Sequence, residues 1–118
     1  MQAIIALLDS TDYWMLADFH CYGEVIYWQD NYNEITDEYR AIAERVMDET
    51  GFGDAGVEDA DSFGGYLQNY ARASSGRFAM TVEIGSYWGY DEADFDSAAY
   101  PLYVVGLLMA DEVAAMEG

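Results

Sequence analysis

The sequence is poor in basic residues. Its 118 residues include no lysine and four arginines against 23 Asp and Glu, so the formal net charge is 4 − 23 = −19. Nucleic-acid binding needs cationic side chains on the phosphates, and docking on anionic membranes needs basic clusters. This balance argues against both classes of partner. An acidic surface is most simply a solvated one, and it would also attract cations.

Cysteine is almost absent as well. The single cysteine, Cys21, permits no intramolecular disulfide, and it leaves the compartment undetermined. Residues 1–8 are apolar but lack the basic start of a signal peptide and are too short to cross a bilayer, so we predict no membrane span. A hydrophobic fraction of 53% excludes intrinsic disorder. The length predicts one domain with one core.

Helical and β-prone segments alternate along the chain. Thr36 is a good N-cap, and apolar residues recur at helical spacing until Gly51. Apolar runs bounded by glycine or polar residues indicate strands. This alternation is typical of an α/β fold. The expected helices are 2–9, 36–50, 66–73 and one beginning at 97, and the expected β-prone segments are 13–19, 24–28 and 78–84.

Two of the apolar runs end on a polar residue. His20, the only histidine, follows one run, and Glu83 follows Thr81-Val82 in the other. Side chains at the carboxyl ends of strands line the ligand crevice of an open α/β sheet, where such a pair could serve as metal ligand and general base. A lone histidine is more often structural, and a catalytic zinc usually has three protein ligands. A complete site would therefore need two carboxylates or another polypeptide.

Other polar residues carry weaker signals. The acidic segment 91–96 offers oxygen ligands for calcium, but it lacks the EF-hand pattern and is equally typical of a surface loop. Cys21 follows His20 directly, and adjacent residues on a strand face opposite sides. We therefore expect Cys21 to point into the packed layer and not to form a dyad with His20.

The order of the segments resembles the C-terminal portion of the zinc metallocarboxypeptidases, over essentially all 118 residues. The motifs that carry the resemblance are His20-Cys21-Tyr22, Gly64-Gly65 before a short helix, and Thr81-Val82-Glu83. The resemblance implies an α/β fold that forms the C-terminal half of a three-layer α/β/α sandwich, with a mixed, mostly parallel sheet. Residues 1–118 would then be a single partial domain.

The resemblance also implies roles for individual residues. His20 corresponds to the third zinc ligand, and Glu83 to the general base for the zinc-bound water. Tyr22 would lie beside the substrate cleft, and Leu67 would fall near the specificity pocket. The parent reaction is metal-assisted hydrolysis of a peptide bond near a chain end, with a peptide or peptidoglycan-type substrate.

The chain departs from the family in what it lacks. The His-x-x-Glu motif with the other two zinc ligands is absent, as are the arginine and the Asn-Arg pair that bind the substrate carboxylate; the mobile tyrosine would fall at Ala60. We therefore expect an inactive fragment that binds zinc weakly. A truncated sheet would leave an open edge, which predicts a homodimer. The alternatives are a non-catalytic acidic interaction module and a cation-binding module.

Overall fold

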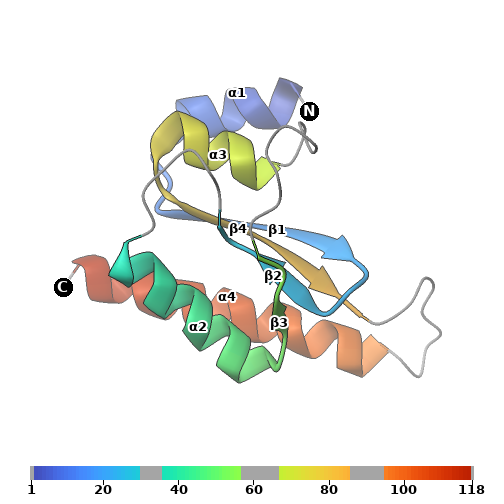
Figure 1. The fold of residues 1–118 in the computed structure, drawn as a ribbon. Coiled ribbons are helices and arrows are strands. Elements are labelled where there is room, and N and C mark those ends of the chain that lie inside the picture. The colour runs from blue at the N-terminus through green and yellow to red at the C-terminus, as the bar shows by residue number, and fades with distance from the viewer. Residues whose placement is uncertain (1, 30–35, 57–66, 86–94, 118) are drawn as a thin grey trace.

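The computed structural model describes residues 2–29, 36–56, 67–85 and 95–117, in which helices and strands alternate (Figure 1). This confirms the α/β fold. Gly64-Gly65, Ala60 and positions 91–94 of the acidic segment lie outside the described residues. The elements are α1 (Gln2–Ser10), β1 (Met15–Cys21), β2 (Val25–Tyr27), α2 (Asp37–Thr50), β3 (Gly53–Asp54), α3 (Leu67–Ser75), β4 (Phe78–Ile84) and α4 (Phe95–Glu117).

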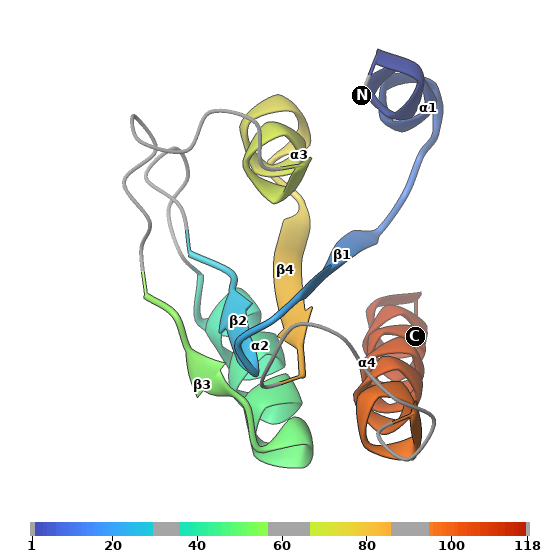
Figure 2. The same ribbon diagram turned by 90° about the vertical axis from the view of Figure 1, so that its right-hand side faces the viewer.

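The strands form one mixed sheet in the order β1-β4-β2-β3. β1 and β4 are parallel, β2 and β3 are parallel, and β2 runs antiparallel to β4. Helices α1 and α3 lie over one face of the sheet, and α2 and α4 lie over the other (Figures 1 and 2). β1 stands at one edge of the sheet, so its outer side meets no other described strand.

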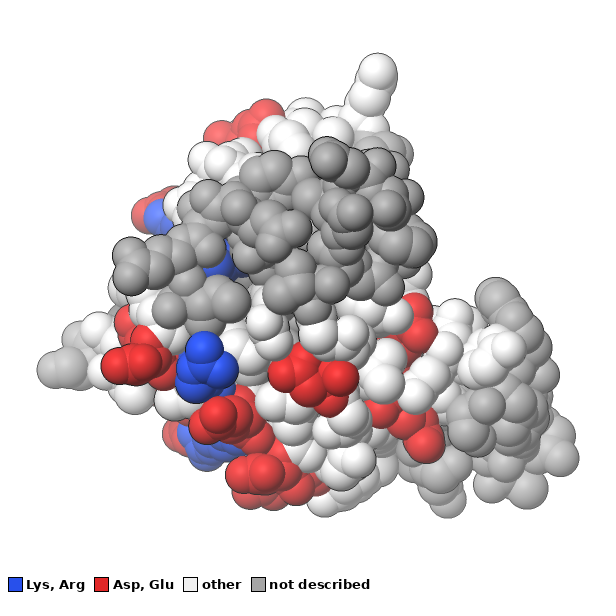
Figure 3. All heavy atoms as spheres, viewed as in Figure 1, with Lys and Arg blue, Asp and Glu red and all other residues white. Residues whose placement is uncertain are grey.

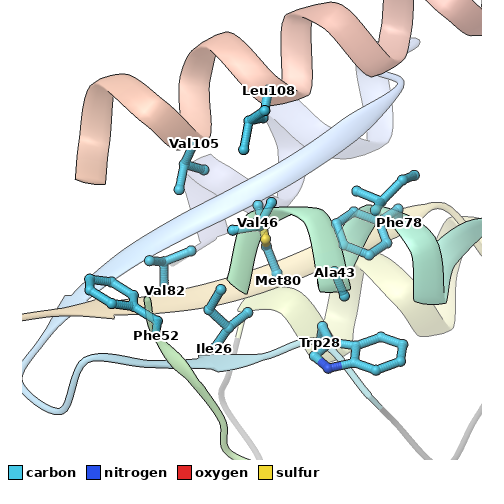
Figure 4. Packing of buried hydrophobic residues seen from close by; sticks show 11 residues of the cluster. Ile26, Trp28, Ala43, Val46, Phe52, Phe78, Met80, Val82, Val105 and Leu108 are labelled. Carbon is cyan, nitrogen blue, oxygen red and sulfur yellow. The ribbon is translucent and has the colours of Figure 1, made fainter. Parts of the chain in front are cut away.

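The core fills the space between the sheet and the α2/α4 layer (Figure 4). β4 alternates between the two faces of the sheet, and its even-numbered residues Phe78, Met80 and Val82 enter this core. Its odd-numbered residues consequently face α1 and α3. The buried hydrophobic cluster consists of Ile26, Trp28, Ile42, Ala43, Val46, Phe52, Phe78, Met80, Val82, Val105 and Leu108.

The two ends of α2 follow the signals in the sequence. The Thr36 hydroxyl accepts a hydrogen bond from the backbone N–H of Tyr39 at 3.1 Å, which satisfies one of the free amides of the first turn. Gly51 ends the helix with φ of 74°, a left-handed conformation that glycine adopts without a Cβ clash, and its N–H bonds to Met47. The predicted N-cap and C-terminus of this helix are confirmed.

Helix α4 begins at Phe95, two residues before the predicted cap, and carries Pro101 inside it. Arg45 of α2 donates to the carboxylates of Asp111 (2.7 Å) and Glu112 (2.8 Å), which ties α4 to α2. The hydrogen bonds to these two acids raise the pKa of Arg45. Residues 99–116 have a mean hydropathy of 1.3, enough by length and composition to cross a membrane, and only 17% of this segment is buried in the fold. The absence of a membrane span therefore stays a prediction.

Helix α1 has no buried residue, so few apolar contacts hold it. The Tyr70 hydroxyl of α3 donates to the carboxylate of Asp9 at 2.7 Å and joins α1 to the helix beside it. This hydrogen bond, together with desolvation, raises the pKa of the Tyr70 phenol. This hydrogen bond is one of the contacts that hold α1.

Candidate functional site

His20 and Glu83 are partners in the register of the parallel strands β1 and β4, one residue before each strand ends. Adjacent strands lie about 4.8 Å apart, and register partners project from the same face of a sheet. The structure therefore brings the two side chains together at the carboxyl edge. The expectation that His20 and Glu83 lie on neighbouring parallel strands and share a face is confirmed.

Both side chains point away from the main core, toward the layer of α1 and α3. They belong to the same alternating set as Thr81, whereas Val82 enters the opposite layer. The Gln68 side-chain carbonyl of α3 accepts the backbone N–H of Thr81 at 3.1 Å. The first turn of α3 therefore lies against β4 two residues before Glu83.

Asp18 holds the His20 ring. Its Oδ2 lies 2.9 Å from Nε2 of His20, and the two residues are on the same face because they are two apart on β1. With neutral histidine, Nε2–H donates to the carboxylate, which leaves the lone pair of Nδ1 available as an acceptor or metal ligand. Among the described residues, Nδ1 makes no hydrogen bond. The exposed fraction of the His20 side chain is 47%, so the ring is open to solvent.

Gly23 leaves room for the Glu83 carboxylate. A Cβ built at Gly23 would lie 2.7 Å from Oε2 of Glu83, closer than nonbonded atoms approach. The Gly23 N–H donates to the Gly85 carbonyl at 2.8 Å, so the chain leaving β1 crosses the end of β4 at this point. The glycine is thus needed for the close approach of backbone and carboxylate.

We expect Gly23→Ala to displace the Glu83 carboxylate at a cost of at most about 1 kcal/mol in the free energy of unfolding, because the clashing atom is the end of a flexible side chain. Because the clashing atom is the Glu83 carboxylate, the cost should fall in a Glu83→Ala background. Urea denaturation of the wild type, both single variants and the double variant measures this coupling. An equal cost of Gly23→Ala in both backgrounds would contradict the proposed contact.

The other residues named from the sequence lie at the same end of the sheet or beside it. Tyr22 follows β1 directly, after a cis peptide bond, and its exposed fraction is 41%. Leu67 is the first residue of α3 and is half-buried. Their substrate-binding roles stay predictions. Cys21 is exposed and does not point into a packed layer, because it ends the edge strand β1, whose last three residues are all exposed.

Sequence reasoning missed Asp18 as a candidate. It sits inside an apolar run and belongs to no motif. Its spacing of two from His20 was the available signal, since residues i and i+2 of a strand share a face. The predicted β-prone segment 13–19 contains Asp18 and ends directly before His20, so this pairing could have been found.

The described residues do not complete a metal site. Among them, no three His, Cys, Asp or Glu side chains are grouped so that they could hold a metal ion. A catalytic zinc is held by three protein ligands with an open fourth position. The part of the chain that the structure describes thus offers one imidazole nitrogen with a supporting carboxylate, and no reaction step through zinc follows from it.

A surface hollow of about 510 Å³ lies away from these residues, near the amino ends of β1 and β4. Arg77, on its rim, is ion-paired with Asp12 and stacks 5.5 Å from the Tyr13 ring centre. The hollow therefore does not join the His20 and Glu83 cluster. Its lining residues are Asp12, Trp14, Glu38, Tyr39, Arg77, Phe78 and Met116.

Comparisons with known proteins identify no family. A scan against models of protein families finds no match, and a search of curated proteins finds no relative. The resemblance to zinc metallocarboxypeptidases therefore rests on the residues and their arrangement alone.

Proposed function

We propose that this chain carries part of a zinc carboxypeptidase-like site, with His20 as metal ligand and Glu83 as general base. The observation that carries the proposal is their register partnership at the carboxyl ends of β1 and β4. In this proposal the chain is the C-terminal half of a carboxypeptidase-like three-layer sandwich. The parent activity is hydrolysis of a peptide bond near the end of a peptide or peptidoglycan-type chain.

The hydrogen bond from Asp18 supports the role of His20. Histidines that bind metals commonly donate their second ring N–H to a carboxylate, which orients the ring and raises its basicity. The Asp18 carboxylate accepts a hydrogen bond from Nε2 of His20, so Nδ1 would be the ligating atom. The role of Glu83 as general base is supported by its position alone. Glu83 lies next to His20 and beside the space left by Gly23. Tyr22 and Leu67 are the proposed substrate contacts.

The chain by itself is proposed to be inactive. One imidazole does not hold a catalytic zinc, and the described residues provide no group of three ligands. The missing His-x-x-Glu and Asn-Arg motifs would come from an upstream segment or another polypeptide. Finding both motifs in the coding sequence before Met1 would support the enzyme, and their absence there would favour a non-catalytic module.

Zinc titration tests the role of His20. We expect the 118-residue chain to bind Zn²⁺ with Kd of roughly 1 mM or weaker, about 4 kcal/mol. In ¹⁵N NMR, zinc should shift Nδ1 of His20 while Nε2 keeps its proton, and His20→Ala should remove the response. Asp18→Asn should weaken binding about tenfold or more, as loss of a supporting carboxylate does.

Two results would contradict this proposal. A zinc response that persists unchanged in His20→Ala would exclude His20 as a ligand. A tight, stoichiometric site that disappears in His20→Ala would show that the chain does contain the remaining ligands. Thr36→Ala is a suitable control, since it removes a helix cap far from β1 in sequence and should leave zinc binding unchanged.

A non-catalytic interaction module is the second candidate function. It is favoured by the apolar side chains that the fold leaves exposed on α1, β1 and α4. A cation-binding module has only the overall negative charge in its support. The exposed apolar surface also has a consequence of its own for assembly.

A further inference from the structure

The exposed large apolar side chains are confined to one part of the fold. In the described residues, all of them lie on α1, on β1 and its two flanking positions, or on α4, whereas α2, α3 and the other strands carry none. α1 and α4 both lie on the β1 side of the sheet (Figure 2). We call these residues the edge surface: Ile4, Leu7, Trp14, Phe19, Tyr22, Tyr100, Leu102, Tyr103 and Leu107.

The edge surface is large enough for a stable interface. Its side chains are 38% to 72% exposed. Since a large aromatic side chain carries 150–250 Å², they leave on the order of 1,000 Å² open. This total is spread over α1, β1 and α4, and a standard protein interface takes about 800 Å² from each partner.

The backbone at this edge is also unpartnered. β1 is seven residues long and pairs with β4 on one side only, among the described strands. The other side presents alternate N–H and C=O groups that a further strand could bond. The edge surface thus combines a strand edge that another strand could pair with and apolar side chains from the helices on both faces of the sheet.

Much of the charge on the described residues lies away from the edge surface. α2 alone carries five acidic residues and two arginines, and these charges gather on the face seen in Figure 3. Residues 2–8 and 97–110, which supply the helical part of the edge surface, contain no charged residue. The helical part of the edge surface is therefore uncharged, and Asp18 is the one acidic residue of β1.

Membrane insertion of α4 does not suit the fold. Pro101, Val105 and Leu108 of α4 are buried against the core, and Arg45 bonds the last turns of the helix. Leaving for a bilayer would break these contacts. A membrane is therefore an outcome of the test below and not the occupant that we argue for.

We propose that the edge surface binds a second copy of this chain, with the two β1 strands antiparallel about a twofold axis at Phe19. This register places Phe19 opposite itself on the α4 side of the sheet. On the other side it places Asp18 opposite His20 of the other copy. The axis is perpendicular to the sheet, so each helix layer continues into the same layer of the second copy.

Neighbouring registers are less favourable. An axis at Asp18 would set two carboxylates directly opposite each other, which is destabilising. An axis between two residues would oppose residues from different faces of the sheet and break the alternation. The Phe19 register avoids both faults and also opposes Ala17 to Cys21 of the other copy.

Sedimentation equilibrium of the full 118-residue chain tests the dimer. We expect a monomer–dimer equilibrium that tightens several-fold from 0.15 M to 1 M NaCl, because salt screens the repulsion between two acidic copies. Phe19→Lys should weaken it at least tenfold by placing two like charges at the axis. Ala41→Lys adds the same charge at an exposed position of α2 and should have little effect.

Disulfide trapping tests the register without relying on affinity. Opposed residues of antiparallel strands have Cα atoms about 4.5–5.5 Å apart, within the range of a disulfide. Ala17→Cys should therefore cross-link to the natural Cys21 of the other copy under mild oxidation. In an Ala17→Cys, Cys21→Ser variant, the two introduced cysteines are too far apart and should not cross-link.

Four outcomes would overturn the proposal. A monomer at all concentrations and salt levels would exclude the dimer, and a dimer unaffected by Phe19→Lys would place the interface elsewhere. Co-sedimentation of the wild type with neutral phosphatidylcholine vesicles, lost in Leu107→Glu, would assign the edge surface to a membrane. Trapping that is equally efficient in the Ala17→Cys, Cys21→Ser variant would exclude the Phe19 register.

Discussion

Phe78→Ala is expected to lower the free energy of unfolding by about 3–5 kcal/mol, as removal of a fully buried phenylalanine usually does. Phe78 begins the central strand β4, and its exposed fraction is 1%. Its ring meets the Tyr39 ring of α2 edge-on, with centroids 5.5 Å apart. The substitution would leave a cavity between β4 and α2 and would remove an aromatic pair.

Phe78→Leu is the matched control for this substitution. Leucine keeps most of the apolar volume but not the edge-on contact with Tyr39, so it should cost less than about 1.5 kcal/mol. Urea denaturation followed by circular dichroism measures both variants. A loss below about 1 kcal/mol for Phe78→Ala would mean that β4 and α2 do not pack as described.

Arg72→Met is expected to destabilise the fold by roughly 2–4 kcal/mol. Arg72 lies on α3, and its exposed fraction is only 2%. Its guanidinium carbon is 4.6 Å from the centre of the Tyr39 ring, and Nη1 donates to the Arg77 carbonyl at 3.3 Å. Methionine fills similar space but supplies neither the charge over the ring nor the donor to the carbonyl.

Arg72→Lys separates the contribution of charge from that of shape. Lysine keeps the charge but lacks the planar group that stacks and donates in a fixed geometry, so we expect it to recover little of the loss. Thermal unfolding at matched protein concentration compares the three proteins. If Arg72→Met is as stable as the wild type, the cost of burying the guanidinium cancels its contacts with Tyr39 and Arg77.

Phe78 and Arg72 act through the same residue. Tyr39 contacts both, and its hydroxyl donates to the Gly76 carbonyl at 2.8 Å in the turn between α3 and β4. The start of α2 is thus joined to the start of β4 and to α3 at one point. This junction lies at the opposite end of β4 from Glu83, so both variants should leave the candidate site intact whenever they fold.

Much of the fold could be predicted because its signals are local. The Thr36 cap and the Gly51 stop act within one helical turn, and both ends of α2 were correct. The two long strands were predicted from their apolar runs, and each extends one residue beyond the polar residue noted in the sequence. The two-residue strand β3 carries too few residues to produce a pattern, and it exists only because it pairs with β2.

The candidate site was predicted in part for the same reason. His20 and Glu83 were visible as polar residues after apolar runs, and a general rule on strand ends placed them together. No sequence pattern singles out Asp18 or Gly23, since their importance comes from contacts with His20 and Glu83. The exposure of Cys21 also depends on the position of β1 at the edge of the sheet.

The sequence by itself determined the elements, the acidic character and the two polar strand ends, because these depend on residues within a few positions of one another. Only the tertiary structure decided the order β1-β4-β2-β3 and the register that pairs His20 with Glu83. It also decided which apolar side chains remain outside the core, since burial depends on segments far apart in the chain. Phe19 is as apolar as the residues of the core, and its exposure follows from the position of β1 at the edge of the sheet.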